Sequence, residues 1–107
     1  MNNKHVLFTA PGVAELLDTP MPVPEADQLV VRTEVSTVSA GTERALVSGD
    51  PNIGIYADGS VVFPRQSGYS SAGTVVAVGE KVTSVKVGDR VAAYWGCHAK
   101  ILPARSV

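Results

Sequence analysis

The sequence predicts a mainly β domain with one short helix, and three features of the chain indicate this fold class. The 107 residues include ten glycines and seven prolines, which suits many turns between short strands. Short runs rich in valine recur along the chain and are separated by those turn residues. Only residues 43–48 combine a helix start signal with a helix stop signal. The length suits one domain over residues 1–107.

The N-terminal part is expected to form a hairpin followed by a long strand. Residues 5–9 predict a strand that ends at Pro11-Gly12, and residues 13–17 are expected to pair back onto it. The alternate prolines of 20–24 enforce an extended segment that pairs poorly. Residues 28–38 predict a strand with one face toward a core. The core face would carry Leu29, Val31, Thr33, Val35 and Thr37, and the wetter face Val30, Arg32, Glu34 and Ser36.

The predicted helix is short and is followed by a long irregular segment. Thr42 is a candidate N-cap, Glu43 suits the first turn, and Gly49 is a candidate stop. Residues 50–66 show no periodicity and predict a long loop, a kind of segment that is often functional. Strands are then expected over 72–78, 91–94 and 99–102, with turns at Gly79-Glu80 and Gly88-Asp89.

Composition and charge exclude several classes of function. The formal net charge is −1 and the pI is about 6.0, so nucleic acids and anionic membranes are poor partners. No apolar run is long enough to span a membrane, and the N-terminus lacks the pattern of a signal peptide. Cys97 is the only cysteine, which excludes an internal disulfide and is consistent with a reducing compartment. We therefore expect a cytoplasmic protein.

Three segments of the chain together carry a family resemblance. Residues 68–91 begin with Gly-Tyr-Ser-Ser-Ala-Gly, continue into a valine-rich strand and a turn, and end with Val-Gly-Asp-Arg-Val. Residues 35–49 place Ser-Ala-Gly-Thr-Glu-Arg at the predicted helix, and a third segment runs from His98-Ala99 to Pro103-Ala104. In this order the segments resemble the N-terminal, alcohol dehydrogenase-like domain of the medium-chain dehydrogenase/reductase superfamily. The resemblance implies a GroES-like, partly open β-barrel.

The resemblance also implies that this chain lacks zinc ligands. Zinc-dependent members take a Cys and a His from the two matching segments, and here Ala40 and Tyr69 stand at those positions, with Ser70 where a Glu follows. Zinc needs three or four sulfur, nitrogen or oxygen ligands, and the soft ligands left are few: Cys97, His98 and His5. We therefore expect no metal site and no zinc, as in the quinone reductase-like branch.

Two residues are the candidate catalytic groups that the resemblance implies. Thr42 matches a hydroxyl that touches the substrate oxygen in alcohol-oxidising members, although a role as helix N-cap is equally open. Tyr69 could donate a hydrogen bond to a substrate carbonyl or could simply fill the space of the missing metal ligand. Ser39, Glu43 and Arg44 are expected to support the substrate cleft. For Arg44, a solvated surface position is the favoured explanation, ahead of contact with an anionic substrate or a cofactor phosphate.

The implied activity belongs to a larger enzyme than this chain. The parent enzyme would use NAD or NADP to transfer a hydride to or from a carbonyl, alcohol or activated alkene. No Gly-x-Gly-x-x-Gly dinucleotide motif occurs in the sequence, so the nucleotide-binding Rossmann domain is expected to be absent. The expected partners are that domain and a small-molecule substrate, and the isolated chain is expected to be inactive.

Two alternatives to a domain of an enzyme remain open at the sequence level. A free-standing GroES-like β-barrel could serve as a binding or assembly module without enzymatic activity. An apolar face that packs on the missing domain would be exposed in the isolated chain and could support a homodimer.

Overall fold

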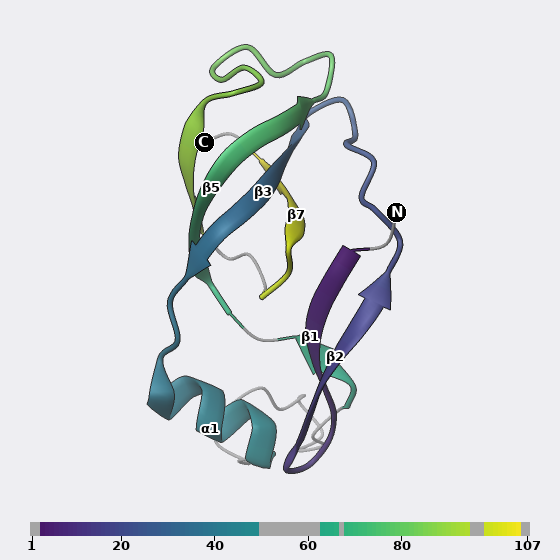
Figure 1. The fold of residues 1–107 in the computed structure, drawn as a ribbon, viewed down its shortest axis with the longest axis vertical. Helices are drawn as coiled ribbons and strands as arrows, with labels where there is room; N and C mark the ends of the chain where they lie inside the picture. The colour runs from purple at the N-terminus through teal and green to yellow at the C-terminus, as the bar shows by residue number, and fades with distance from the viewer. Residues whose placement is uncertain (1–2, 50–62, 67, 95–97, 106–107) are drawn as a thin grey trace, which may run out of the picture.

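Two antiparallel sheets and one helix make up the described part of the chain (Figure 1). The computed structural model describes residues 3–49, 63–66, 68–94 and 98–105. The first sheet has the strand order β2-β1-β4, and the second has the order β6-β5-β3-β7. The elements are β1 (Asn3–Ala10), β2 (Val13–Thr19), β3 (Gln28–Ser36), α1 (Ala40–Ser48), β4 (Arg65–Gln66), β5 (Ser70–Val78), β6 (Arg90–Tyr94) and β7 (Ile101–Arg105).

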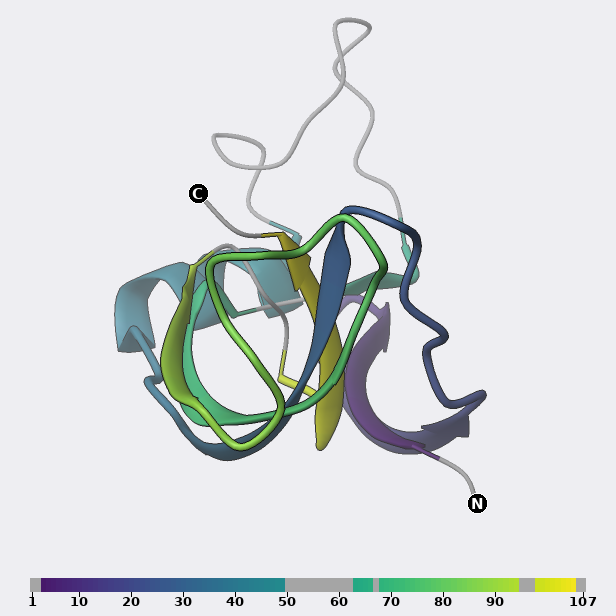
Figure 2. The ribbon, with the colours of Figure 1, turned by 90° about the horizontal axis from the view of Figure 1, so that it is seen from above.

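The prediction of a mainly β, partly open fold with one short helix is confirmed. The strands of the second sheet curve strongly, and the β1–β2 hairpin lies to one side of them (Figure 2). The two sheets do not share a hydrogen-bonded ladder between their described strands, so these strands form no closed barrel. In the described part of the chain, no helix has the length and apolar character that a membrane span requires.

Residues 98–100 join the two sheets through backbone hydrogen bonds. The Val6 N–H donates to the His98 carbonyl at 2.9 Å, and the Lys100 N–H donates to the Lys4 carbonyl at 2.8 Å. On the other side, the Thr33 N–H donates to the Lys100 carbonyl at 2.8 Å. This short segment is therefore held between β1 and β3, and the side chain of His98 has a fixed point of attachment.

The main core is built from side chains of the second sheet. Val31, Val75 and Leu102 have almost no exposed surface, and they come from three adjacent strands. Leu29 and Ala93 complete this cluster, and Val82 and Val85 of the loop between β5 and β6 pack against it. Burial of these side chains supplies the main driving force that holds β3, β5, β6 and β7 together.

The predicted alternation of buried and exposed residues along β3 is wrong at both ends of the strand. Leu29, Val30 and Val31 are all buried, whereas Val35 is 60% exposed. The ladder between β3 and β5 shifts register between Val30 and Val31 and again between Thr33 and Val35. The shift between Thr33 and Val35 places one extra residue, Glu34, on β3 and so changes the face that Val35 occupies. The other shift places its extra residue, Val76, on β5, so Val30 is buried because this end of β3 is covered on both faces.

The helix begins three residues earlier than the sequence predicts, so Thr42 is not its N-cap. Ser39 is the N-cap: its backbone is extended, with φ −92° and ψ 103°, and its carbonyl accepts the Glu43 N–H at 2.9 Å. Thr42 is the third residue of the helix. The predicted stop is confirmed, because Gly49 adopts a left-handed conformation with φ 78° and its N–H donates to the Ala45 carbonyl.

The segment predicted as a long loop over 50–66 contains a short strand at its end. The last two residues of this segment form β4, and Gln66 of β4 pairs with Leu7 of β1. Residues 50–62 of the predicted loop lie outside the described residues. The predicted strands over 72–78, 91–94 and 99–102 are present with shifted bounds, since Ala99 makes only an isolated bridge to His5 and β7 begins at Ile101. At the predicted turn of Gly88-Asp89, the Asp89 carboxylate accepts the Lys86 N–H at 3.0 Å.

Glu34 connects three strands on the outer face of the second sheet. The Thr74 hydroxyl donates to its carboxylate at 2.7 Å, and Arg90 donates at 3.0 Å. The Thr74 hydrogen bond, followed by the charge of Arg90, lowers the pKa of Glu34 from its ordinary value. A lowered pKa in the folded state means that Glu34 stabilises the fold above its unfolded-state pKa, and that this contribution is lost as the pH falls toward the folded-state value.

We expect Thr74→Val and Arg90→Gln each to raise the pKa of Glu34 toward its ordinary value. The first variant removes the hydroxyl hydrogen bond, and the second removes the charge and the hydrogen bond of the guanidinium. Carbon-13 NMR of the Glu34 carboxyl over an acid titration measures both shifts. An unchanged midpoint in Thr74→Val would contradict the hydrogen bond between β3 and β5.

Candidate functional site

The half-buried face of α1 carries three polar residues in its first turns. Ser39, Thr42 and Glu43 are half-buried together with Leu46, and this spacing of three and four residues places them on one face of the helix. The Ser39 hydroxyl donates to Thr42 Oγ1 at 3.3 Å. Because Thr42 accepts in this bond, its own O–H can donate to another acceptor.

Glu43 forms one end of a chain of side-chain hydrogen bonds. Its Oε1 lies 2.9 Å from His98 Nε2, and the Ser36 hydroxyl lies 2.8 Å from His98 Nδ1. The side chains of His98 and Glu43 are 13% and 15% exposed, so both groups are largely withdrawn from water. These hydrogen bonds link the start of α1, the segment before β7 and the end of β3. We call Ser36, His98 and Glu43 the polar chain.

Gly68 packs directly against the imidazole of His98. Its φ is 103°, and a Cβ at this position would lie 3.1 Å from both Cδ2 and Nε2 of that ring. A residue with a side chain would therefore be strained here and would press on His98. Tyr69 follows at once and is half-buried. The next carbonyl, of Ser70, accepts both the N–H and the hydroxyl of Thr37, at 3.0 and 3.2 Å.

The structure brings most of the predicted site residues into one region. Ser39, Thr42 and Glu43 share one helix face. Tyr69 directly follows Gly68, which packs against His98, the hydrogen-bond partner of Glu43. Arg44 is exposed on the other face of α1, away from these three residues. The position of these residues alone assigns no chemistry to them. Their catalytic or supporting roles therefore belong to the function proposed below.

Sequence reasoning missed Ser36 and His98 as members of this region. They lie 62 residues apart in the chain, and His98 lies 55 residues from Glu43, so no local motif joins them. One signal could have found His98. Glu43 shares a helix face with Leu46 and so should be half-buried, and a buried carboxylate needs a donor. The sequence has only two histidines, so only two imidazoles were candidates for the donor to the Glu43 carboxylate.

The residues of this region do not fit a catalytic zinc ion. Such an ion takes three protein ligands and leaves one position open. His98 and Glu43 are two candidate ligands, and they are hydrogen-bonded to each other. Over the described ranges, no group of three or more His, Cys, Asp or Glu side chains could hold a metal. Ala40, at the position of a family ligand, has no donor atom in its side chain, and Cys97 lies outside the described residues.

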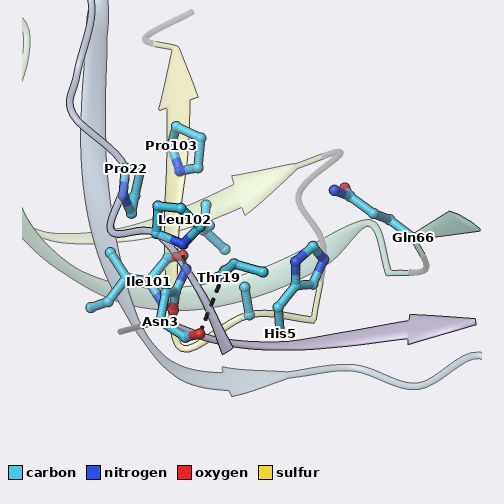
Figure 3. A pocket seen from close by; sticks show the side chains of 10 residues that line it. Asn3, His5, Thr19, Pro22, Gln66, Ile101, Leu102 and Pro103 are labelled. Atoms are coloured by element: carbon cyan, nitrogen blue, oxygen red, sulfur yellow. Dashed lines mark hydrogen bonds between the residues drawn. The ribbon is translucent and has the colours of Figure 1, made fainter. Parts of the chain in front are cut away.

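A separate hollow of about 320 Å³ lies between β1, the residues after β2, and β7 (Figure 3). Thr19 donates to the Asn3 carbonyl at its edge, and His5 and Gln66 face it from β1 and β4. His5 Nε2 is buried and has no hydrogen-bond partner within the part of the chain that the structure describes. None of Ser36, Thr42 and Glu43 lines this hollow. We place the candidate site at the polar chain, where ionisable and hydroxyl groups from several segments converge.

Two curated relatives of this chain are named as a dehydrogenase or a dehydrogenase-like protein. The chain is 31% identical over 99 residues to the zinc-type alcohol dehydrogenase-like protein YdjJ of Escherichia coli K12, a match that covers 85% of this chain and 25% of YdjJ. It is 36% identical over 87 residues to an L-threonine 3-dehydrogenase of Symbiobacterium thermophilum, covering 81% of this chain and 23% of that enzyme. The chain thus spans about a quarter of the length of these relatives.

A solved structure and a family comparison agree with these relatives. The quinone oxidoreductase of Pseudomonas syringae pv. tomato DC3000 superimposes with a TM-score of 0.72 at 28% identity, covering 98% of this chain and 31% of that protein. Residues 25–104 match the family described as the alcohol dehydrogenase GroES-like domain. These residues include all of β3, all of α1 and the polar chain. The chain therefore belongs to the alcohol dehydrogenase GroES-like domain family, the N-terminal domain of medium-chain dehydrogenases/reductases.

Proposed function

We propose that this chain is the substrate-side domain of an NAD(P)-dependent medium-chain oxidoreductase. The reaction transfers a hydride between the nicotinamide and a carbonyl, an alcohol or an activated alkene. The observation that carries this proposal is the family match over residues 25–104, together with relatives named as dehydrogenases and a quinone oxidoreductase. A single cysteine in the chain is consistent with the cytoplasm as the place of this reaction.

Thr42 and Tyr69 are the proposed catalytic residues of this domain. Negative charge develops on the substrate oxygen during hydride transfer, and hydroxyl donors aimed at that oxygen stabilise it. Thr42 suits this role because Ser39 donates to it and leaves its own O–H for a second partner. Glu43 supports the site through His98. Arg44, on the exposed face of α1, would contact only a ligand or a domain that lies outside the described residues.

The nicotinamide supplies the hydride when it is bound, and a nucleotide-binding domain is the proposed partner that binds it. A dinucleotide site needs a Gly-x-Gly-x-x-Gly turn between a strand and a helix, and this sequence has no such motif. We also propose that the enzyme works without zinc, because Ala40 and Tyr69 cannot replace the missing thiolate and imidazole as ligands. The substrate oxygen would then depend on hydroxyl donors alone.

The test is an assay of the full-length protein that carries this sequence. We expect oxidation of NADH or NADPH in the presence of at least one member of a panel of quinones, aldehydes, ketones and enones. Overnight dialysis against a zinc chelator should leave this activity unchanged. Absence of turnover in both directions across the panel would overturn the proposed function, and loss of activity that zinc restores would overturn its zinc-free form.

We expect residues 1–107 alone to show no saturable binding of NADPH. The reason is that the phosphates and ribose are held by the nucleotide-binding domain, whereas this domain would contact only the nicotinamide end. Isothermal titration calorimetry measures the outcome, with the full-length protein as the positive control. Saturable binding of NADPH at micromolar concentration by the short chain would contradict the assignment of cofactor binding to the other domain.

A further inference from the structure

The proposed reaction leaves one requirement unmet by Thr42 and Tyr69. A carbonyl oxygen whose carbon receives a hydride must also receive a proton to become an alcohol, and an alcohol must lose that proton in the reverse direction. Aliphatic and phenolic hydroxyls stabilise the oxygen but ordinarily hold their protons at neutral pH. Histidine is the side chain whose charge ordinarily changes near neutral pH. His98 is the histidine that lies within this region.

The two ring nitrogens of His98 have different partners, and this difference assigns their roles. An ionised Glu43 carboxylate can only accept, so the 2.9 Å contact requires a hydrogen on Nε2. Nδ1 is therefore the nitrogen that gains and loses a proton, and the Ser36 hydroxyl faces it at 2.8 Å. Any proton that reaches or leaves Nδ1 along this chain passes through Ser36.

The imidazole is also held in place from its other sides. Gly68 packs against the ring edge, and the carbonyl of His98 itself accepts the Val6 N–H at 2.9 Å. Within the described residues, Glu43 of α1 is the ionisable side chain in contact with the ring, while β3 contributes the Ser36 hydroxyl and β1 a backbone amide. Tyr69 is the nearest ionisable residue along the segment that carries Gly68. A fixed ring with one charged neighbour is the arrangement that directional proton transfer needs.

A second, independent observation indicates a polar group beside Ser36. Ser71 lies directly opposite Ser36 in the ladder between β3 and β5, so the two side chains share a face of the sheet. Ser71 is 8% exposed, and its hydroxyl is buried without a hydrogen-bond partner in the residues that the structure describes. Buried hydroxyls in folded proteins nearly always have a partner. A substrate oxygen beside Ser36 would supply one.

We propose that Ser36, His98 and Glu43 form a proton relay that serves the substrate oxygen. This proposal rests on the function proposed above and deepens it. In the reducing direction, the Ser36 hydroxyl gives its proton to the oxygen of the carbonyl whose carbon has taken the hydride. Ser36 recovers a proton from Nδ1 of the His98 imidazolium, and the ring becomes neutral. Nε2 keeps its hydrogen throughout and continues to donate it to the Glu43 carboxylate. Solvent then returns one proton to His98, and oxidation of an alcohol runs the same steps in reverse.

The relay narrows the class of substrate. It delivers its proton to an oxygen, so the reacting pair is a carbonyl and its alcohol. Reduction of an activated alkene ends with the proton on carbon, so it does not require the delivery of a proton to an oxygen by this relay. Glu43 acts through His98 and is a positioning residue, whereas Ser36 touches the reacting oxygen and is catalytic.

The experiment measures kcat of the full-length protein against pH, in water and in deuterium oxide, for the wild type and five variants. We expect Ser36→Ala and His98→Asn to lower kcat by about 10²- to 10⁴-fold and to change the pH profile of kcat from that of the wild type. Glu43→Gln should also change this profile, and Glu43→Asp should partly restore it. Glu34→Gln, a matched change on the outer face of β3, should leave both the rate and the profile unchanged.

The possible outcomes separate the relay from the proposed function. A wild type without hydride transfer overturns both. An active wild type whose Ser36→Ala and His98→Asn variants keep the wild-type pH profile overturns the relay alone and leaves a purely structural tie between α1 and the sheets. If His98→Asn does not fold, Ser36→Ala decides, because it keeps the pair between the ring and Glu43. Nitrogen-15 NMR of the imidazole gives a further check: a neutral ring protonated on Nδ1 instead of Nε2 would also overturn the relay.

Discussion

Replacing Gly73 with alanine is expected to lower the free energy of unfolding by about 3 kcal/mol, the upper part of the usual range for added bulk in a packed interior. Gly73 lies opposite Thr33 in the ladder between β3 and β5. A Cβ on this residue would overlap the backbone carbonyl oxygen of Arg32 and lie 2.8 Å from Cγ1 of Val31. Val31 has no exposed surface, so it cannot turn away.

The size of this effect follows from what would have to move. The clash is mainly with the backbone of β3, so relief requires the two central strands of the sheet to separate and to weaken their hydrogen bonds. A loss of about 3 kcal/mol is a large share of the stability of a small domain. Urea unfolding followed by circular dichroism measures the change, with the midpoint and the slope reported separately.

Gly41→Ala is the matched control for Gly73→Ala. Gly41 lies in the first turn of α1, is exposed, and has open space where its Cβ would be. Alanine is the better helix former, so this variant should keep the wild-type stability or gain up to about 1 kcal/mol. Equal stability of the wild type and Gly73→Ala would show that β3 and β5 do not pair in this register.

The sequence could predict β3 as a strand but could not predict its faces. Alternation of apolar and polar residues indicated the correct element, because each valine needs burial on one side. The two register shifts come from the ladder with β5, which is a property of two strands together. Val30 is buried where a wetter face was expected, because both faces of the strand are covered at this end, and Val35 is exposed where a core face was expected. The extra residue on β3, Glu34, turns Val35 to the other face.

The start of α1 shows a similar limit. Ser39 and Thr42 are both residues that commonly cap helices, and the intervening Ala-Gly pair offers little local preference for the helix. Tertiary contacts decide the choice, because a start at Ala40 places Thr42 and Glu43 on the half-buried face, where Glu43 meets His98. A start at Glu43 would leave Thr42 outside the helix and change the face that Glu43 presents.

The candidate site was half predictable for the same physical reason. Ser39, Thr42 and Glu43 lie within five residues of the sequence, and the family resemblance grouped them as site residues. Ser36 and His98 join them only because residues 98–100 are hydrogen-bonded to both β1 and β3. Contacts that depend on how two sheets meet are not encoded in any local pattern.

Replacing Thr42 with valine is expected to lower kcat of the full-length enzyme by about 10²- to 10³-fold, the usual cost of removing one donor to a developing oxyanion. The change removes the hydroxyl and keeps the branched shape of the side chain. Thr42→Ser keeps the donor and should retain kcat within about tenfold of the wild type. KM should change little in either variant, because the donor acts most strongly on the charge that appears in the transition state.

The two neighbours of this hydroxyl sharpen the test. Ser39→Ala removes the bond of 3.3 Å to Thr42 Oγ1, so it should lower kcat less than Thr42→Val and should have little further effect in the double variant. Tyr69→Phe should lower kcat by a further factor in the Thr42→Val background if both hydroxyls donate to the same oxygen. A Thr42→Val enzyme with wild-type kcat would remove Thr42 from the chemistry and leave it as a packing residue of α1. In that case the polar chain of Ser36, His98 and Glu43 would have to stabilise the substrate oxygen as well as supply its proton.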